Sequence, residues 1–68
     1  MNLEDHIGDQ VWSNKAYKYY DLVDVIEGKS GDKYALVKNG NDEIKIIEAD
    51  NIGGYWNRFS EEFRSIGG

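Results

Sequence analysis

Three apolar segments in the middle of the chain have the length and composition of β-strands. Residues 19–26 are rich in aromatic and β-branched side chains, residues 34–37 are a short apolar run, and residues 44–47 begin with alternating isoleucine and lysine. Polar and glycine-containing turns separate them, and the second turn contains Asn39-Gly40, a strong β-hairpin signal. Two consecutive hairpins predict a three-stranded antiparallel meander. The residues expected to face its core are Val23, Val25, Val37, Ile44 and Ile46.

The flanking segments predict shorter elements. Residues 8–12 are typical of a short first strand that begins at a glycine. Before it, residues 3–7 have room for one helical turn with Asn2 as its cap. After the meander, residues 48–52 are expected to form a tight turn that leads into Gly53-Gly54.

Residues 13–28 allow a second interpretation, a helix that begins after Ser13 and ends at Gly28. That helix would convert the fold into an α+β, β-grasp arrangement. The aromatic and β-branched side chains between Tyr17 and Ile26 favour a strand, because such residues lose side-chain freedom in a helix. We therefore expect a mainly β fold.

The C-terminal segment, residues 55–66, carries an aromatic pattern with helical spacing. Its apolar residues, three, four and three positions apart, are Trp56, Phe59, Phe63 and Ile66. This spacing predicts one face of a short helix within residues 56–66, packed against the rest of the domain. In a second interpretation, residues 55–59 form a last strand and Ser60 caps a shorter helix. The sequence does not decide between these two starting points of the helix.

Length and composition describe a single domain spanning residues 1–68. A chain of this size buries only about 60% of the surface that it exposes when unfolded, so its stability is expected to be small. There is no cysteine for disulfides, and the nine aromatic residues must supply much of the core. The absence of cysteine, of a secretory signal and of an apolar run of about 20 residues predicts a cytoplasmic protein.

Thirteen acidic residues against eight basic ones give a net charge of −5. This balance argues against direct binding to nucleic acid or to an anionic membrane, since both depend on many Lys and Arg contacts. It favours a protein partner with a basic surface. The oligomeric state stays open.

No pattern indicates an enzyme. The sequence lacks a phosphate-binding loop, a dinucleotide fingerprint, a nucleophile elbow and a metal-binding histidine motif. His6 alone cannot form a zinc site, and it is expected to be a solvated residue of the acidic N-terminal turn. No serine has a neighbouring base. We expect no catalytic residues, no metal and no cofactor.

Taken in order, the expected elements resemble an SH3-like or Tudor-like small β-barrel. Residues 8–12, 19–26, 34–37 and 44–47 match its first four strands, and residues 48–52 match the short turn before its final strand. The resemblance implies a barrel core at about residues 8–52, followed by the aromatic C-terminal segment 55–66 with its short helix. Tudor-like barrels often carry an aromatic cage for methylated lysine or arginine. The positions available for one here are Trp12, Tyr19, Tyr20 and Tyr34.

A second resemblance concerns the end of the sequence. Gly67-Gly68 is similar to the diglycine of ubiquitin-like sulfur carriers, which is activated as an adenylate, and residues 39–47 resemble the hairpin that precedes their tail. The chain departs from that pattern because about twenty residues follow Ile47. The resemblance implies an alternative function as a group carrier.

The tyrosines and acids of residues 17–24 form a candidate binding surface. Tyrosine and tryptophan are enriched in binding hot spots, and carboxylates steer a basic partner. The complete set of expected binding residues is Trp12, Tyr17, Tyr19, Tyr20, Asp21, Asp24 and Tyr34. The small, acidic, cysteine-free chain looks like the accessory proteins of bacteriophages and mobile elements. This resemblance implies a module that binds and blocks a host protein, either through such a patch or through an acidic surface that imitates nucleic acid. Solubility alone would also account for the acids.

Overall fold

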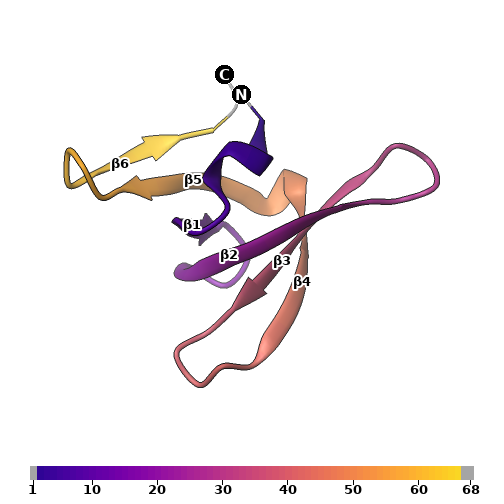
Figure 1. The fold of residues 1–68 in the computed structure, drawn as a ribbon, viewed down its shortest axis with the longest axis horizontal. Coiled ribbons are helices and arrows are strands. Elements are labelled where there is room, and N and C mark those ends of the chain that lie inside the picture. The colour runs from indigo at the N-terminus through magenta and orange to yellow at the C-terminus, as the bar shows by residue number, and fades with distance from the viewer. Residues whose placement is uncertain (1, 67–68) are drawn as a thin grey trace.

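The computed structural model describes residues 2–66, and these residues are mainly β (Figure 1). The elements, with 3₁₀ helices labelled η, are η1 (Leu3–His6), β1 (Gln10–Ser13), β2 (Lys18–Glu27), β3 (Lys33–Lys38), β4 (Ile44–Glu48), η2 (Ala49–Asn51), β5 (Ile52–Asn57) and β6 (Glu62–Ser65). The strands form one six-stranded antiparallel sheet in the order β4-β3-β2-β1-β5-β6.

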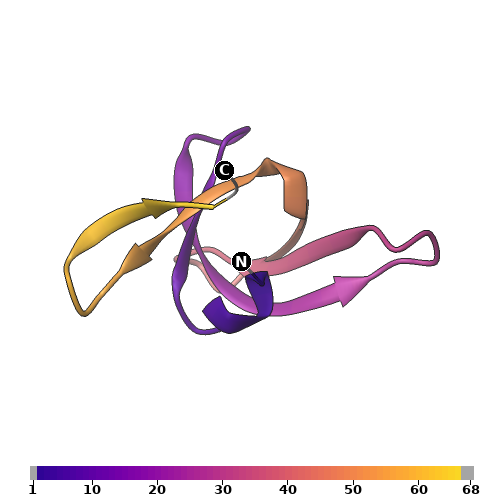
Figure 2. The same ribbon diagram turned by 90° about the horizontal axis from the view of Figure 1, so that it is seen from above.

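The sheet is strongly curled, and two of its hairpins project in opposite directions (Figures 1 and 2). The β2–β3 hairpin extends to one side, the β5–β6 hairpin extends to the other, and β1 lies between β2 and β5 (Figures 1 and 2). Residues far apart in the sequence therefore share one sheet, with β1 joining the meander to the C-terminal hairpin.

The predicted meander is confirmed, and local hydrogen bonds explain its second turn. The side-chain Oδ1 of Asn39 accepts hydrogen bonds from the backbone N–H groups of Asn41, at 2.8 Å, and Glu43, at 3.0 Å. This is the short-range bonding that favours asparagine in turns. Because residues 18–27 are a strand, the helix over residues 13–28 is wrong, and the α+β arrangement that required it is absent from residues 2–66.

The core lies on the concave side of the curled sheet. Its buried apolar residues are Leu3, Val11, Tyr20, Leu22, Ala35, Val37, Ile52 and Tyr55. Val37 was predicted there, and Val25 packs against the cluster. The inward placement of Val23, Ile44 and Ile46 is wrong, because these side chains are 41%, 54% and 64% exposed.

A register shift on β2 explains part of this difference. The pairing with β3 is irregular between Leu22 and Asp24, so that Leu22 and Val25 both face the core although three positions separate them. A bulge of this kind reverses which side chains face the core. On β4, Ile47 lies opposite the buried Ala35 and takes the inward position. Ile44 and Ile46 consequently fall on the other face of the sheet.

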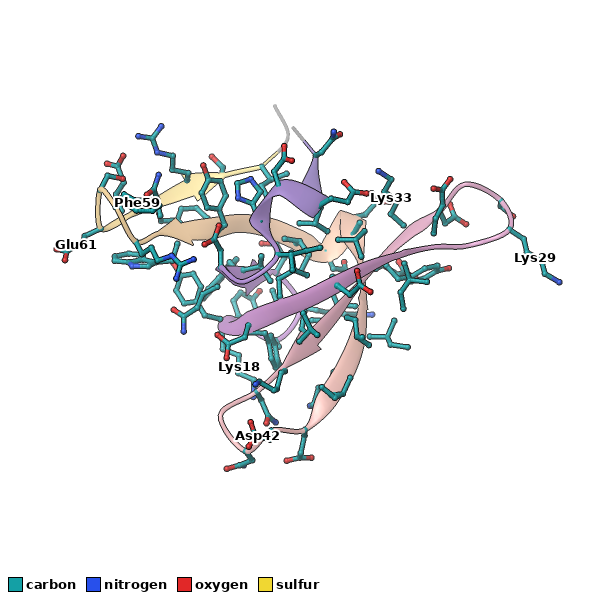
Figure 3. The ribbon with its side chains drawn as sticks, viewed as in Figure 1. Lys18, Lys29, Lys33, Asp42, Phe59 and Glu61 are labelled. Atoms are coloured by element: carbon teal, nitrogen blue, oxygen red, sulfur yellow. The ribbon has the colours of Figure 1, made fainter. Side chains whose placement is uncertain are left out.

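The helix predicted within residues 56–66 is wrong, since this segment forms β5, a turn and β6. Asn57 determines the turn: its Oδ1 accepts hydrogen bonds from the backbone N–H groups of Phe59, at 3.0 Å, and Ser60, at 3.2 Å. Glu61 completes the turn at a φ of 52°. Phe59 therefore lies at the hairpin tip, 93% exposed, rather than packed on the domain (Figure 3). The second interpretation, with a strand beginning near residue 55, was closer to the structure.

The N-terminal turn is part of the folded structure. His6 was expected to be solvated, but it is buried, and its ring stacks on Tyr55 with 3.8 Å between centroids. Its Nδ1 lies 3.4 Å from Oδ2 of Asp9. The stacking partner comes from β5, forty-nine positions later in the chain, and so sequence spacing did not indicate it. Asn2 makes no side-chain capping bond.

Candidate binding surfaces

Four aromatic side chains from four adjacent strands gather on one face of the sheet. Trp12 on β1 lies opposite Tyr19 on β2, and Trp56 on β5 lies opposite Phe63 on β6. Directly paired residues share a face of the sheet. Strands β1 and β5 are themselves paired, with Trp12 opposite Gly54, and Trp56 lies two positions beyond Gly54, so the two aromatic pairs lie on the same face. We call Trp12, Tyr19, Trp56 and Phe63 the aromatic surface.

Tyr19 is the centre of the aromatic surface. Its ring lies edge-on to three others, with centroid distances of 5.1 Å to Trp12, 6.3 Å to Trp56 and 6.4 Å to Phe63. Edge-on pairs at such distances contribute about 0.5–1.5 kcal/mol each beyond their buried area. The rings nevertheless stay accessible, and a shallow hollow of about 270 Å³ lies between Trp12, Tyr19 and Phe63. The surface is thus ordered before any ligand arrives.

Gly54 allows the C-terminal hairpin to complete this surface. It lies opposite Trp12 on one side and Ser65 on the other, and a Cβ there would collide with the Phe63 ring and the carbonyl oxygen of Arg64. The Phe63 ring therefore lies over the glycine backbone.

Sequence reasoning missed Trp56 and Phe63 as surface residues, because their spacing resembled a helix face. A glycine pair followed directly by two aromatic residues, Tyr55 and Trp56, was the available signal.

The structure separates the residues that sequence reasoning grouped together. Trp12 and Tyr19 belong to the aromatic surface, whereas Tyr20 is only 3% exposed and belongs to the core. Tyr34 lies on the meander, where it lines another hollow with Ile26 and Ile46. Tyr17 is 78% exposed in the β1–β2 turn. A cage built from all four predicted positions is therefore not present among residues 2–66.

Tyr17 has a strained backbone. Its φ is 55°, in the left-handed region that costs an L-residue with a Cβ about 1–2 kcal/mol. Its N–H donates to the carbonyl of Ser13 at 2.9 Å, which closes the turn around it. Asp42 and Glu61 adopt the same left-handed conformation in the β3–β4 and β5–β6 turns, so the strain at Tyr17 accompanies the reversal of the chain.

Two of the three acids of β2 lie opposite lysines on the neighbouring strand. Asp21 pairs with Lys38 across the β2–β3 ladder, and Glu27 pairs with Lys33. Asp24 lies between them and accepts a hydrogen bond from the N–H of Val25 at 2.8 Å. Negative charges on β2 therefore alternate with positive charges on β3, whereas a nucleic acid strand presents a continuous run of negative phosphates.

One ion pair ties the N-terminal turn to the meander. Lys33 Nζ donates to Glu4 Oε1 at 2.8 Å. The hydrogen bond from Lys33 holds the pKa of the Glu4 carboxyl below its ordinary value and raises the pKa of Lys33. Both groups are exposed, so solvent screens the pair, and its role is local positioning.

No group of three or more His, Cys, Asp or Glu side chains within residues 2–66 is arranged to hold a metal ion. No helix in the same range is long and apolar enough to cross a membrane. Gly67-Gly68, on which the group-carrier alternative depends, lies outside the described residues.

Comparison with known proteins gives no assignment. No family model matches the chain, and no curated protein or solved structure is significantly similar to it. Function is therefore inferred from the geometry of the surfaces described above.

Proposed function

We propose that this chain is a non-catalytic protein-binding module that contacts its partner through the aromatic surface. The observation that carries the proposal is the gathering of four accessible rings from four adjacent strands on a single sheet face. Large aromatic side chains provide contact area at a low conformational cost, and binding hot spots are enriched in them. A hydrogen-bonded sheet holds them in place before binding.

We further propose that the architecture is an SH3-like small barrel extended by a C-terminal hairpin. The order β4-β3-β2-β1-β5 supports this assignment, together with the single 3₁₀ turn, η2, between β4 and β5. In this interpretation β5 is the final barrel strand and β6 is an addition. The addition supplies Phe63 and so enlarges the binding face.

The proposed partner is a cytoplasmic protein with a basic surface, which the module binds and blocks in the manner of a phage accessory protein. The net charge of −5 would steer such a partner toward the domain. Imitation of nucleic acid is the less supported mode, because Lys38 and Lys33 oppose the acids of β2. Affinity would come from the aromatic surface and association rate from the charge.

A specific observation favours a second candidate function, a Tudor-like reader of methylated lysine or arginine. Trp12, Tyr19 and Phe63 surround the hollow of about 270 Å³, and ring faces attract quaternary ammonium groups through cation–π interactions. Titration with a trimethyllysine peptide and its unmodified counterpart separates the two functions. A preference for the methylated peptide that is lost in Tyr19→Ala would favour the reader.

The main proposal is tested by comparing variants in the same capture experiment. Proteins retained from a bacterial lysate by the wild-type domain are identified by mass spectrometry, and the partner's kinetics are then measured. Tyr19→Ala and Phe63→Ala should speed dissociation, with a loss of about 2 kcal/mol or more, or roughly thirtyfold, at a hot spot. Phe59→Ala is the matched control, because that ring lies outside the aromatic surface at the hairpin tip (Figure 3). A partner that responds equally to all three substitutions, or to none, would show that binding occurs elsewhere.

A further inference from the structure

A groove lies beside β4, at the opposite end of the sheet from β6. It has a volume of about 320 Å³, with residues 45–48 on one side and Lys15 and Ala16 of the β1–β2 turn on the other. Ser13 and Tyr20 lie between the two sides. The volume is at the lower end for ligand sites, which suits a short chain segment rather than a folded domain. None of the residues of the aromatic surface lines it.

The groove follows the free edge of a β-strand. Four consecutive residues, 45–48, line it, although successive side chains of a strand point to opposite faces. All four can border one groove only if the groove follows the strand edge, where the backbone itself is exposed. β4 pairs with β3 on its other side and is the last strand of the sheet among the described residues. Its outer edge therefore presents N–H and C=O groups to which an extended peptide can bond.

Lysines without carboxylate partners surround this groove. Lys33, Lys38 and both arginines form ion pairs within residues 2–66, whereas Lys15, Lys18 and Lys45 form none there. Lys15 and Lys45 line the groove, and Lys18 holds its Nζ 5.3 Å from the ring centre of Tyr20, which also lines it. One carboxylate, that of Glu48, also lines the groove. Two lining lysines and the neighbouring Lys18 outnumber it, so the groove has a local excess of positive charge, which suits anionic groups, in a protein of net charge −5.

The two faces of β4 differ in chemistry. Lys45 lies opposite the buried Val37, and Lys18 lies opposite the buried Ser13, so both begin on the concave side of the sheet. Ile44 and Ile46 lie on the convex side and are exposed. Glu48 follows them on the convex side, opposite Tyr34. A strand added to this edge would meet positive charge on the concave face, and on the convex face an apolar surface that ends at the Glu48 carboxylate.

We propose that the groove binds an acidic peptide segment in extended conformation, added as a further strand beside β4. Its alternate carboxylates face Lys15, Lys18 and Lys45, and its intervening apolar side chains cover Ile44 and Ile46. This is a second binding site, distinct from the aromatic surface and independent of the function proposed for it. A peptide suits the groove better than nucleic acid does, because the exposed strand edge complements a peptide backbone. Three lysines in an acidic protein are also few for binding phosphates.

The probe is an acetylated and amidated peptide, Glu-Val-Glu-Val-Glu, titrated into the ¹⁵N-labelled full chain. We expect shifts of the backbone amides of residues 45–48 and of Lys15, with those of Trp12 and Tyr19 unaffected. Charge reversal exchanges an attraction for a repulsion, so Lys15→Glu and Lys45→Glu should each weaken binding by about three- to tenfold. Lys29→Glu is the matched control, since Lys29 is another lysine that forms no ion pair with residues 2–66 but lies at the far tip of the β2–β3 hairpin (Figure 3). N-methylation of the peptide amides that face β4 should abolish binding.

Several outcomes would overturn the proposal. The first is that the amide signals of residues 45–48 and Lys15 do not shift when the peptide is added. The second is that Lys45→Glu and Lys29→Glu change the affinity for the peptide equally. The third and fourth are that a peptide with lysine in place of glutamate binds as tightly, and that N-methylation leaves binding unchanged. Tighter, Lys45-dependent binding of a short oligothymidylate would show that the groove recognises nucleic acid instead. Because the three substituted lysines are exposed and make no ion pair within residues 2–66, these variants are expected to fold.

Discussion

Replacing Gly54 with alanine tests the packing that creates the aromatic surface. Gly54 is buried on β5, with Trp12 opposite on one side and Ser65 opposite on the other. The added methyl would collide with the Phe63 ring and with the carbonyl oxygen of Arg64. The ring can rotate away, but the carbonyl belongs to the backbone of β6. Relief of that collision therefore requires the β5–β6 pairing to loosen.

The expected loss follows from two opposing effects. Inserting a methyl into a filled site costs about 1–3 kcal/mol. Replacing glycine restricts the unfolded chain and returns about 0.4–1 kcal/mol. Taken at the middle of each range, the net loss is about 1.3 kcal/mol, which for a domain of this size lowers Tm by roughly 5–10 °C. This is a large share of the few kcal/mol that a domain of this length possesses.

Thermal and urea unfolding followed by circular dichroism measure this loss. Gly40→Ala is the matched control, because a Cβ there meets nothing within 4 Å and the backbone does not have a positive φ. That variant should equal or slightly exceed the wild type in stability. The Gly54→Ala substitution should cost less free energy of unfolding when it is made in Phe63→Ala than when it is made in the wild type. Some cost should persist, since the carbonyl of Arg64 remains. If Gly54→Ala melts with the wild type, the Phe63 ring does not lie over Gly54 and the aromatic surface is arranged differently.

Three further predictions concern the core, the ion pair and the hairpin tip. Leu22→Ala should lower the free energy of unfolding by about 2–5 kcal/mol and Val23→Ala by less than about 1 kcal/mol in urea titrations; the reverse order would contradict the β2 bulge. In an NMR pH titration Glu4 should show a depressed pKa that returns toward its ordinary value in Lys33→Ala, and an unchanged midpoint would show that the pair does not form. Because that pKa is lowered on folding, the pair stabilises the domain above the ordinary carboxyl range, and its contribution is lost as pH falls through the folded-state pKa of Glu4. Phe59→Ala should change stability by no more than about 0.5 kcal/mol, and a larger loss would show that its ring packs on the domain.

The sequence by itself determined the elements that local chemistry controls. Asn39 bonds within its own turn, and the β-branched residues of 18–27 favour a strand over a helix, so the meander followed from residues close together in the chain. Composition likewise indicated a small, mainly β domain. Trp12 and Tyr19 were identified as candidate binding residues from their type and position alone.

Tertiary structure decided everything that depends on which strands become neighbours. Trp56 and Phe63 have a helical spacing, yet they pair across a hairpin because Gly54 leaves space for a ring and Asn57 favours a turn. The bulge at Val23 moves side chains from one face to the other, and no local pattern reports it. The groove beside β4 brings together lysines more than twenty-five positions apart. Non-local contacts of this kind depend on which whole strands pair and in which register. The pattern of neighbouring residues in the sequence does not specify that pairing, so it becomes visible only in the folded structure.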